Sequence, residues 1–115
     1  MYLLTWNSAK SRIEATFGGR ISKKEATHFS DELKSLLAAR DDADFKVLVD
    51  LSTINSMPKK VEESLLESRE VCLSSGAKNV TYITGDEEKA QLRRSQRMEQ
   101  VLDGSEQYVP YLHAS

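Results

Sequence analysis

The sequence has little cysteine and little proline, and it has no long hydrophobic run. Cys72 is the single cysteine among 115 residues, which excludes an internal disulfide. No apolar stretch approaches the roughly 20 residues that span a bilayer. The first residues also lack the basic start and the long apolar segment of a signal peptide. We therefore expect a cytoplasmic protein without a membrane span.

The charge balance and the length narrow the class of protein further. Sixteen basic and 18 acidic side chains give a net charge of −2, so the chain lacks the basic footprint of a general nucleic-acid binder. There are no repeats, low-complexity tracts or linkers, and the length is typical of one domain. We expect a single domain over residues 1–115 that can bury its own core.

The N-terminal residues predict a hairpin. Residues 2–6 form a short apolar and aromatic run, and residues 12–17 alternate apolar and polar side chains. A period of two is typical of a strand with one wet face. The two segments are close enough to pair as antiparallel strands. Gly18 and Gly19 are predicted to end the second strand.

Capping signals predict where the first two helices begin and end. Ser22 and Glu25 have the spacing of a capping box, and the apolar side chains that follow keep helical spacing over residues 23–39. Pro58 suits the first turn of a second helix, and Gly76 suits the left-handed residue just after its end.

Three further strands follow from apolar runs. Residues 45–51 are almost continuously apolar, which indicates a central strand followed by a loop over residues 52–57. Residues 80–84 are rich in β-branched side chains and predict another strand. Asp86 is predicted to cap a third helix that reaches about residue 102. Residues 108–112 are predicted to form an edge strand because Pro110 cannot donate to a ladder.

These elements define an α/β fold with the order ββαβαβαβ. Strands joined through helices should be parallel, whereas the first two are joined by a tight turn. The second strand alternates apolar and polar side chains, which leaves one face of the sheet partly polar. We expect a mixed sheet of four to five strands with the helices mainly on one face.

Three stretches resemble the STAS domain, a family named for sulfate transporters and anti-sigma-factor antagonists. Residues 17–22, Phe-Gly-Gly-Arg-Ile-Ser, are similar to the family's strand that enters its first helix. Residues 47–54, Val-Leu-Val-Asp-Leu-Ser-Thr-Ile, are similar to its central strand and loop. Residues 107–111, Gln-Tyr-Val-Pro-Tyr, stand where its last short strand lies.

The resemblance implies a regulatory, protein-binding domain rather than an enzyme. Antagonist-type members are phosphorylated on a serine in an Asp-Ser-Ser-Gly motif that opens the second helix. Here residues 58–61 are Pro-Lys-Lys-Val, so a lysine stands at the acceptor position. The chain is similar to a divergent SpoIIAA-like member, and the resemblance implies that serine phosphorylation does not switch it.

The end of the central strand and the start of the second helix form the candidate partner surface. This surface comprises Asp50, Ser52, Asn55, Ser56, Met57, Lys59 and Lys60. Ser56 is also the candidate phosphoacceptor, with a helix cap or turn residue as the alternative. Asp50 lies at the sheet edge where α/β proteins place ligands, with a turn-forming acid as the alternative. The two lysines suit an anion at a helix N-terminus, and ordinary surface lysines are the alternative.

The third predicted helix carries a basic stripe. Lys89, Arg93 and Arg97 recur at intervals of four, with Arg94 beside them. Such a stripe suits an acidic partner or phosphate groups. The alternative is a solvated face paired with nearby acids, namely Glu87, Glu88 and Glu99.

No catalytic or cofactor motif is present. Cys72, His28 and His113 are not spaced as metal ligands, and there is no glycine-rich phosphate loop, so no cofactor is expected. The leading hypothesis is binding to another protein. The alternative is a small-molecule domain that holds a lipid or nucleotide under its helices. Its candidate lining, which fits a plain core equally well, is Phe29, Leu33, Leu36 and Leu37. A homodimer through residues 108–112 is a further hypothesis, which Pro110 disfavours.

Overall fold

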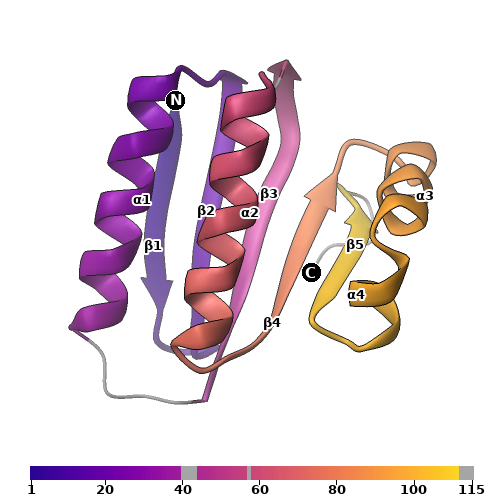
Figure 1. Ribbon diagram of the computed structural model, residues 1–115. Coiled ribbons are helices and arrows are strands. Elements are labelled where there is room, and N and C mark those ends of the chain that lie inside the picture. The colour runs from indigo at the N-terminus through magenta and orange to yellow at the C-terminus, as the bar shows by residue number, and fades with distance from the viewer. Residues whose placement is uncertain (40–43, 57, 112–115) are drawn as a thin grey trace.

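Five strands and four helices make up the fold in the computed structural model, which describes residues 1–39, 44–56 and 58–111 (Figure 1). The elements are β1 (Tyr2–Asn7), β2 (Arg12–Arg20), α1 (Lys23–Ala38), β3 (Phe45–Ser56), α2 (Lys59–Ser74), β4 (Ala77–Thr84), α3 (Glu87–Gln96), α4 (Met98–Leu102) and β5 (Glu106–Pro110).

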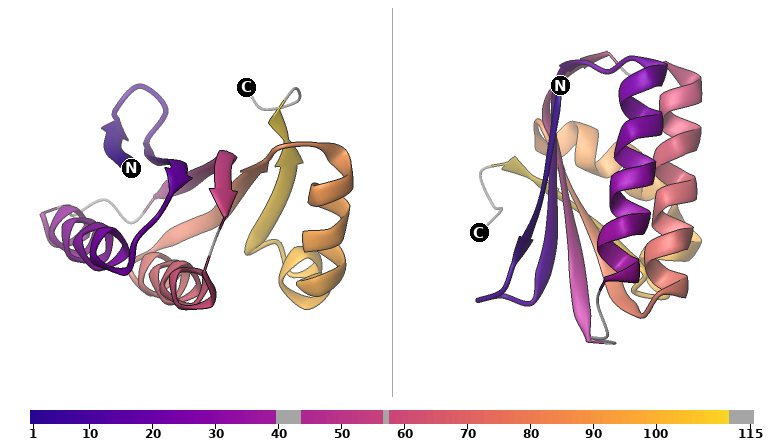
Figure 2. Two further views of the ribbon diagram at one scale, coloured as in Figure 1. Left: turned by 90° about the horizontal axis from the view of Figure 1, so that it is seen from above. Right: turned by 90° about the vertical axis from the view of Figure 1, so that its left-hand side faces the viewer.

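The sheet has the strand order β1-β2-β3-β4-β5. β1 and β2 are antiparallel, and every later neighbour is parallel. Within the described residues, all helices lie on one face of this sheet, and α1 and α2 are side by side while α3 stands apart (Figure 2). The predicted fold class, a mixed sheet with helices on one face, is therefore confirmed. No helix among the described residues is long and apolar enough to cross a membrane.

The core lies between the sheet and the helices. Apolar side chains that alternate along β2 and β3 meet the buried stripe of α1 and α2. Tyr2, Phe17 and Phe29 form an aromatic cluster at one end, with the Phe17 and Phe29 rings 4.8 Å apart. Burying side chains of this kind supplies most of the favourable free energy of folding.

The predicted helix signals are confirmed in α1 and α2. The Glu25 amide donates to Ser22 Oγ at 3.1 Å, and the Ser22 amide donates to Glu25 Oε1 at 3.4 Å, which is a complete capping box. Pro58 precedes the first residue of α2. Gly76 follows its last turn with φ +108°, a conformation that favours glycine.

The predicted C-terminal ends of β2 and β3 were both wrong, because the two strands pair with each other beyond those ends. Gly18 and Gly19 do not end β2, because they pair with Thr53 and Ile54 of β3. Gly19 has φ +65° beside a shift in register, which is a β-bulge and not a turn. The predicted loop over residues 52–57 is therefore strand as far as Ser56, and residue 57 lies outside the described residues. Ladder pairing depends on backbone groups, so polar side chains did not prevent it.

The last two elements also differ from their predictions. The third helix breaks at Arg97, whose φ of −123° and ψ of 34° are not helical, and a short α4 follows. β5 begins at Glu106, two residues earlier than expected, and Pro110 is its last residue. β5 lies at the edge of the sheet as predicted for a strand that contains proline. Residue 112 lies outside the described residues.

Candidate functional site

The predicted partner surface is divided between two faces of the molecule. Val49 is buried beneath the helices and Leu51 also lies on the helix side, so Asp50 between them points to the opposite face. The Asp50 Oδ1 atom accepts from the Ser52 amide at 2.9 Å and from Ser52 Oγ at 2.6 Å. The Asp50 side chain thus bonds to the backbone two residues on, but Asp50 lies inside β3 and does not form the turn that the alternative expected.

The end of β3 and the start of α2, which carry the other described residues of that surface, lie at the top of the molecule in Figure 1. Asn55 and Ser56 end β3, and Met57 lies outside the described residues. Lys59 and Lys60 are exposed in the first turn of α2, where no side chain caps the helix. The structure therefore leaves these two lysines as an exposed basic edge.

The predicted basic stripe of α3 is broken up by ion pairs within α3 and to α2 and β5. Arg94 pairs with Glu87 at 2.8 Å, as expected for a solvated face paired with nearby acids. It also donates to the Tyr108 carbonyl of β5. Arg93 instead pairs with Glu62 of α2 at 2.7 Å. The arginines therefore fasten α3 to its surroundings and do not form one free surface.

Arg97 binds a buried carboxylate that sequence reasoning missed. Glu106 at the start of β5 is fully buried, and Arg97 donates to both of its oxygens, at 3.1 and 2.7 Å. Tyr108 Oη donates to it at 2.7 Å. Arg69 of α2 forms an ion pair through Nε at 2.9 Å, although this Nε makes no hydrogen bond. A buried charge of this kind needs such partners to be tolerated.

The network also shifts the acid–base behaviour of its members. Burial alone raises the pKa of Glu106, but hydrogen bonds from Arg97 and Tyr108 hold that pKa below its usual range. Burial and the bond to Glu106 raise the pKa of Tyr108. Glu106 is therefore ionised at neutral pH and binds the α3–α4 junction to the sheet.

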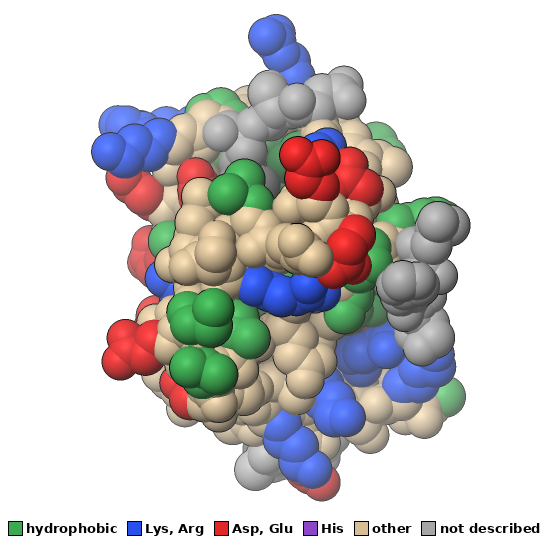
Figure 3. Space-filling model, turned by 90° about the vertical axis from the view of Figure 1, so that its right-hand side faces the viewer, with side chains coloured by type: hydrophobic (Ala, Val, Ile, Leu, Met, Phe, Trp, Pro, Cys, Tyr) green, Lys and Arg blue, Asp and Glu red, His purple; other side chains and the backbone are tan. Residues whose placement is uncertain are grey.

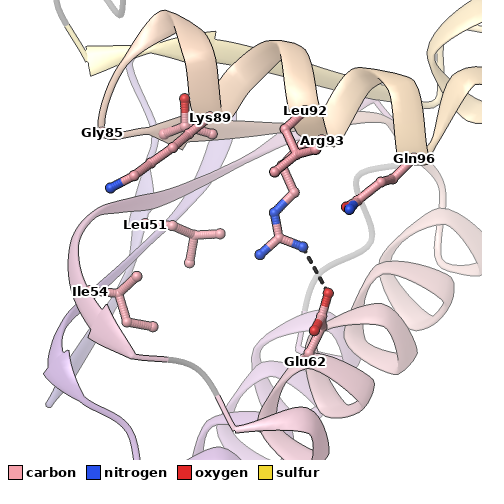
Figure 4. Close-up of a pocket in the computed structure, with 9 residues that line it drawn as sticks. Leu51, Ile54, Glu62, Gly85, Lys89, Leu92, Arg93 and Gln96 are labelled. Atoms are coloured by element: carbon pink, nitrogen blue, oxygen red, sulfur yellow. Dashed lines mark hydrogen bonds and ion pairs between the residues drawn. The ribbon is translucent and has the colours of Figure 1, made fainter.

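A groove opens between α2 and α3, above the carboxyl ends of β3 and β4. Its volume is about 350 Å³. Figure 4 shows Leu51 and Ile54 of β3 on one side of the groove, Glu62 of α2 and Arg93 of α3 pointing toward each other, and Lys89 of α3 pointing toward the side where Leu51 and Ile54 lie. The complete lining is Leu51, Ile54, Glu62, Thr84, Gly85, Lys89, Leu92, Arg93 and Gln96.

The groove continues into a narrower apolar pocket of about 70 Å³. The two share several walls, including Leu51, Glu62 and Arg93, and the narrow part adds Leu65, Leu66, Arg97 and the tyrosines of β4 and β5. The rings of Tyr82 and Tyr108 are stacked there with centroids 5.1 Å apart. The groove thus has a wide end that includes Lys89 and a narrow end in which leucine and tyrosine side chains lie beside the two arginines and Glu62.

The face that carries α3 and α4 also exposes apolar side chains. α3 buries only Ala90 and α4 buries nothing, whereas Leu92, Met98 and Leu102 are at least half exposed. Figure 3 shows hydrophobic side chains gathered on this side of the molecule beside charged ones. Few buried apolar side chains therefore hold α3 and α4 to the rest of the fold, and the groove separates α3 from α2.

The residues of α1 that were named as a candidate small-molecule lining fit the alternative, a plain core. Phe29, Leu33 and Leu37 are buried in the core, and Leu36 packs against it. A space of about 20 Å³ lies beside Phe29 and Leu33, enough for about one water molecule. The sequence signal for the groove was the polar composition of the segment that forms α3. In the structure this helix buries only Ala90.

Cysteine and histidine are placed as ordinary structural residues. Cys72 is buried, and burial raises the pKa of its thiol to about 12. His28 is exposed on α1, and His113 lies outside the described residues. Within the described residues no three His, Cys, Asp or Glu side chains gather as metal ligands would.

Comparison with known proteins identifies the fold but no relative by sequence. No family model and no curated protein matches this chain. A solved structure does match, that of an uncharacterised protein of the DUF3478 family with a SpoIIAA-like fold from Shewanella loihica PV-4. The match covers 96% of this chain and 84% of that one, with a TM-score of 0.64 and 12% sequence identity. The chain has a SpoIIAA-like fold, as the resemblance of its strand motifs implied.

Proposed function

We propose that this chain is a non-catalytic binding domain whose site is the groove between α2 and α3, and that its ligand is a small molecule. The observation that carries this proposal is the cavity of about 350 Å³ at the carboxyl ends of two parallel strands. Open α/β sheets bind ligands at that edge, and ligand pockets begin at about this volume.

The chemistry of the lining supports binding rather than catalysis. Among the residues of the groove, the Thr84 hydroxyl donates to the backbone carbonyls of Asp86 and Val109. The Glu62 carboxylate is held by Arg93. Acid–base or nucleophilic catalysis needs two such groups within reach of one another and of a substrate atom. These groups are instead committed to structural partners.

Native mass spectrometry of freshly purified protein and NMR titration with octan-1-ol test the proposal. We expect native mass spectrometry to show a retained ligand. We expect the octanol titration to shift amide signals only in β3, α2 and α3. Ile54→Trp should weaken both, because the larger indole side chain occupies part of the groove. Leu3→Trp is the matched control, since Leu3 is 61% exposed on β1, away from the groove. Unchanged binding in Ile54→Trp would show that the groove is the wrong site.

A second candidate is a regulatory role in which the chain binds another protein. We propose for it the candidate partner surface, which comprises Asp50, Ser52, Asn55, Ser56, Met57, Lys59 and Lys60. The observation in its favour is the exposed pair Lys59 and Lys60 at the start of α2, where the helix dipole disfavours cations and no side-chain cap compensates. A pulldown from native cytosol, with Asn55, Lys59 and Lys60 replaced by alanine, tests it. Partners retained by that variant would exclude this edge.

Phosphorylation of Ser56 belongs to the same candidate. Phosphate there would place nearly two negative charges before the N-terminus of α2. Mass spectrometry of protein isolated from its native cells would detect the phosphopeptide, and its absence under all growth conditions would agree with a domain that serine phosphorylation does not switch.

A further inference from the structure

Lys89 is a cation at the rim of the groove without an acidic partner among the described residues. It is exposed on the first turn of α3, whereas the neighbouring arginines all bind acids or carbonyls. Figure 4 shows its side chain lying across Gly85 toward the side of the groove where Leu51 and Ile54 lie. A Cβ atom at Gly85 would lie an ordinary 3.5 Å from Lys89 Nζ, so the ammonium group lies close to the Gly85 backbone at this end of the groove.

Arg93 supplies a second cation with donors to spare. Its Nη1 donates to Glu62 across the groove at 2.7 Å, and its side chain is 34% exposed. A guanidinium has five N–H donors in a planar fork, and this one hydrogen bond uses only one of them. The remaining donors can bind a second acceptor while Glu62 stays in place.

The charges of the groove add up to an excess of one positive charge. Lys89 and Arg93 are cationic, and Glu62 is the one acid in the lining. The floor between them is apolar, from the half-buried Leu51 and Ile54, and the wall includes Leu92, which is 57% exposed. A ligand that satisfies both properties carries one anionic group at the wide end and an apolar chain directed into the narrow end.

We propose that the groove binds a single-chain amphiphile with one anionic head group, a carboxylate or a phosphate monoester. The head group lies between Lys89 and Arg93, and the chain covers Leu51 and Ile54 and reaches the stacked tyrosines. This inference rests on the proposed function, and it adds the charge and shape of the ligand.

Titration with three eight-carbon probes tests it. Octanoate, octan-1-ol and octyltrimethylammonium share one chain and differ in head group, and calorimetry or NMR gives each Kd. We expect octanoate to bind about tenfold more tightly than octanol, because a charge-assisted hydrogen bond is worth that factor or more. The cation should bind more weakly than both. Octyl phosphate compared with octanoate distinguishes the two head groups, and inorganic phosphate measures the head-group site alone.

Variants of the groove assign the selectivity. Lys89→Met keeps an unbranched side chain but removes the charge, so it should remove most of the preference for octanoate without changing the octanol Kd. Lys60→Met removes an exposed lysine that lies outside the groove lining. It should leave the preference for octanoate and the octanol Kd unchanged. Glu62→Gln should tighten octanoate binding, because it raises the positive excess and frees Arg93.

The outcomes separate this inference from the function on which it rests. Equal Kd values for octanoate and octanol would overturn the anionic head group and leave the groove as a site for neutral ligands. Selectivity that survives in Lys89→Met would overturn the assignment to Lys89. Binding of none of the probes, in protein shown by circular dichroism to be folded, would overturn the proposed function as well.

Discussion

Arg97 and Glu106 join the break between α3 and α4 to the first residue of β5. The two N–O contacts of this pair measure 3.1 and 2.7 Å, and the carboxylate that accepts them is fully buried. α3 leaves its helical path at the same residue that makes these contacts. Since α3 buries only Ala90, this pair and the Arg94 contacts to Tyr108 hold the outer wall of the groove in place.

Replacement of Glu106 by glutamine should destabilise the fold severely. The variant keeps the shape of the side chain but leaves Arg69 and Arg97 without their buried counter-charge. Breaking a buried ion pair by removing one partner costs about 3 kcal/mol or more. Urea denaturation measures the loss, with the exposed Glu99→Gln as control. A loss below about 1 kcal/mol would show that water or other groups satisfy the two arginines.

The contribution of Glu106 to stability should also depend on pH. Its pKa is lower in the folded chain than in the unfolded chain, because hydrogen bonds from Arg97 and Tyr108 outweigh the effect of burial. The stabilisation is therefore complete above the unfolded pKa of about 4.3 and is lost as pH falls through the folded value. Denaturation of wild type and Glu106→Gln between pH 7 and pH 3 checks this. Their difference in unfolding free energy should shrink only on the acid side, and a constant difference would contradict the assignment.

The bulge in β2 gives a matched pair of glycine variants. Gly19→Ala should destabilise the fold by about 1 kcal/mol. Gly19 has φ +65°, a conformation that is unfavourable for alanine although no atom lies within 4 Å of the new Cβ. Gly18→Ala is the control, since its new Cβ would only touch Thr53 Oγ1 at an ordinary 3.5 Å. Thermal unfolding of both variants measures the difference. Equal stability of the two would mean that the bulge relaxes without cost.

Cys72 should react with thiol reagents only when the chain unfolds. It is 1% exposed, and burial raises its pKa to about 12, so almost no thiolate exists near pH 8. A disulfide reagent that reports thiol release should modify the native protein slowly and the urea-unfolded protein at once. Modification of native protein at the rate of free cysteine would show that α2 opens readily from the sheet.

Many of the elements could be predicted from the sequence, because the signals that define them act over a few residues. Ser22 and Glu25 bond within one turn, Gly76 ends α2 through its own backbone, and the apolar run in β3 needs only its neighbours. The Asp-Leu-Ser strand motif led to the correct fold class for the same reason.

Only the tertiary structure decided where the strands end and where the groove lies. Gly18 and Gly19 read as a terminator in the sequence, yet backbone pairing with residues 53–56 extends both strands. In the sequence Glu106 looks like a surface acid. In the structure it pairs with Arg69, which lies 37 positions earlier in the chain, and with Arg97, which lies nine positions earlier. The groove combines strand ends, α2 and α3, so its apolar floor and cationic rim meet only when distant segments pack together.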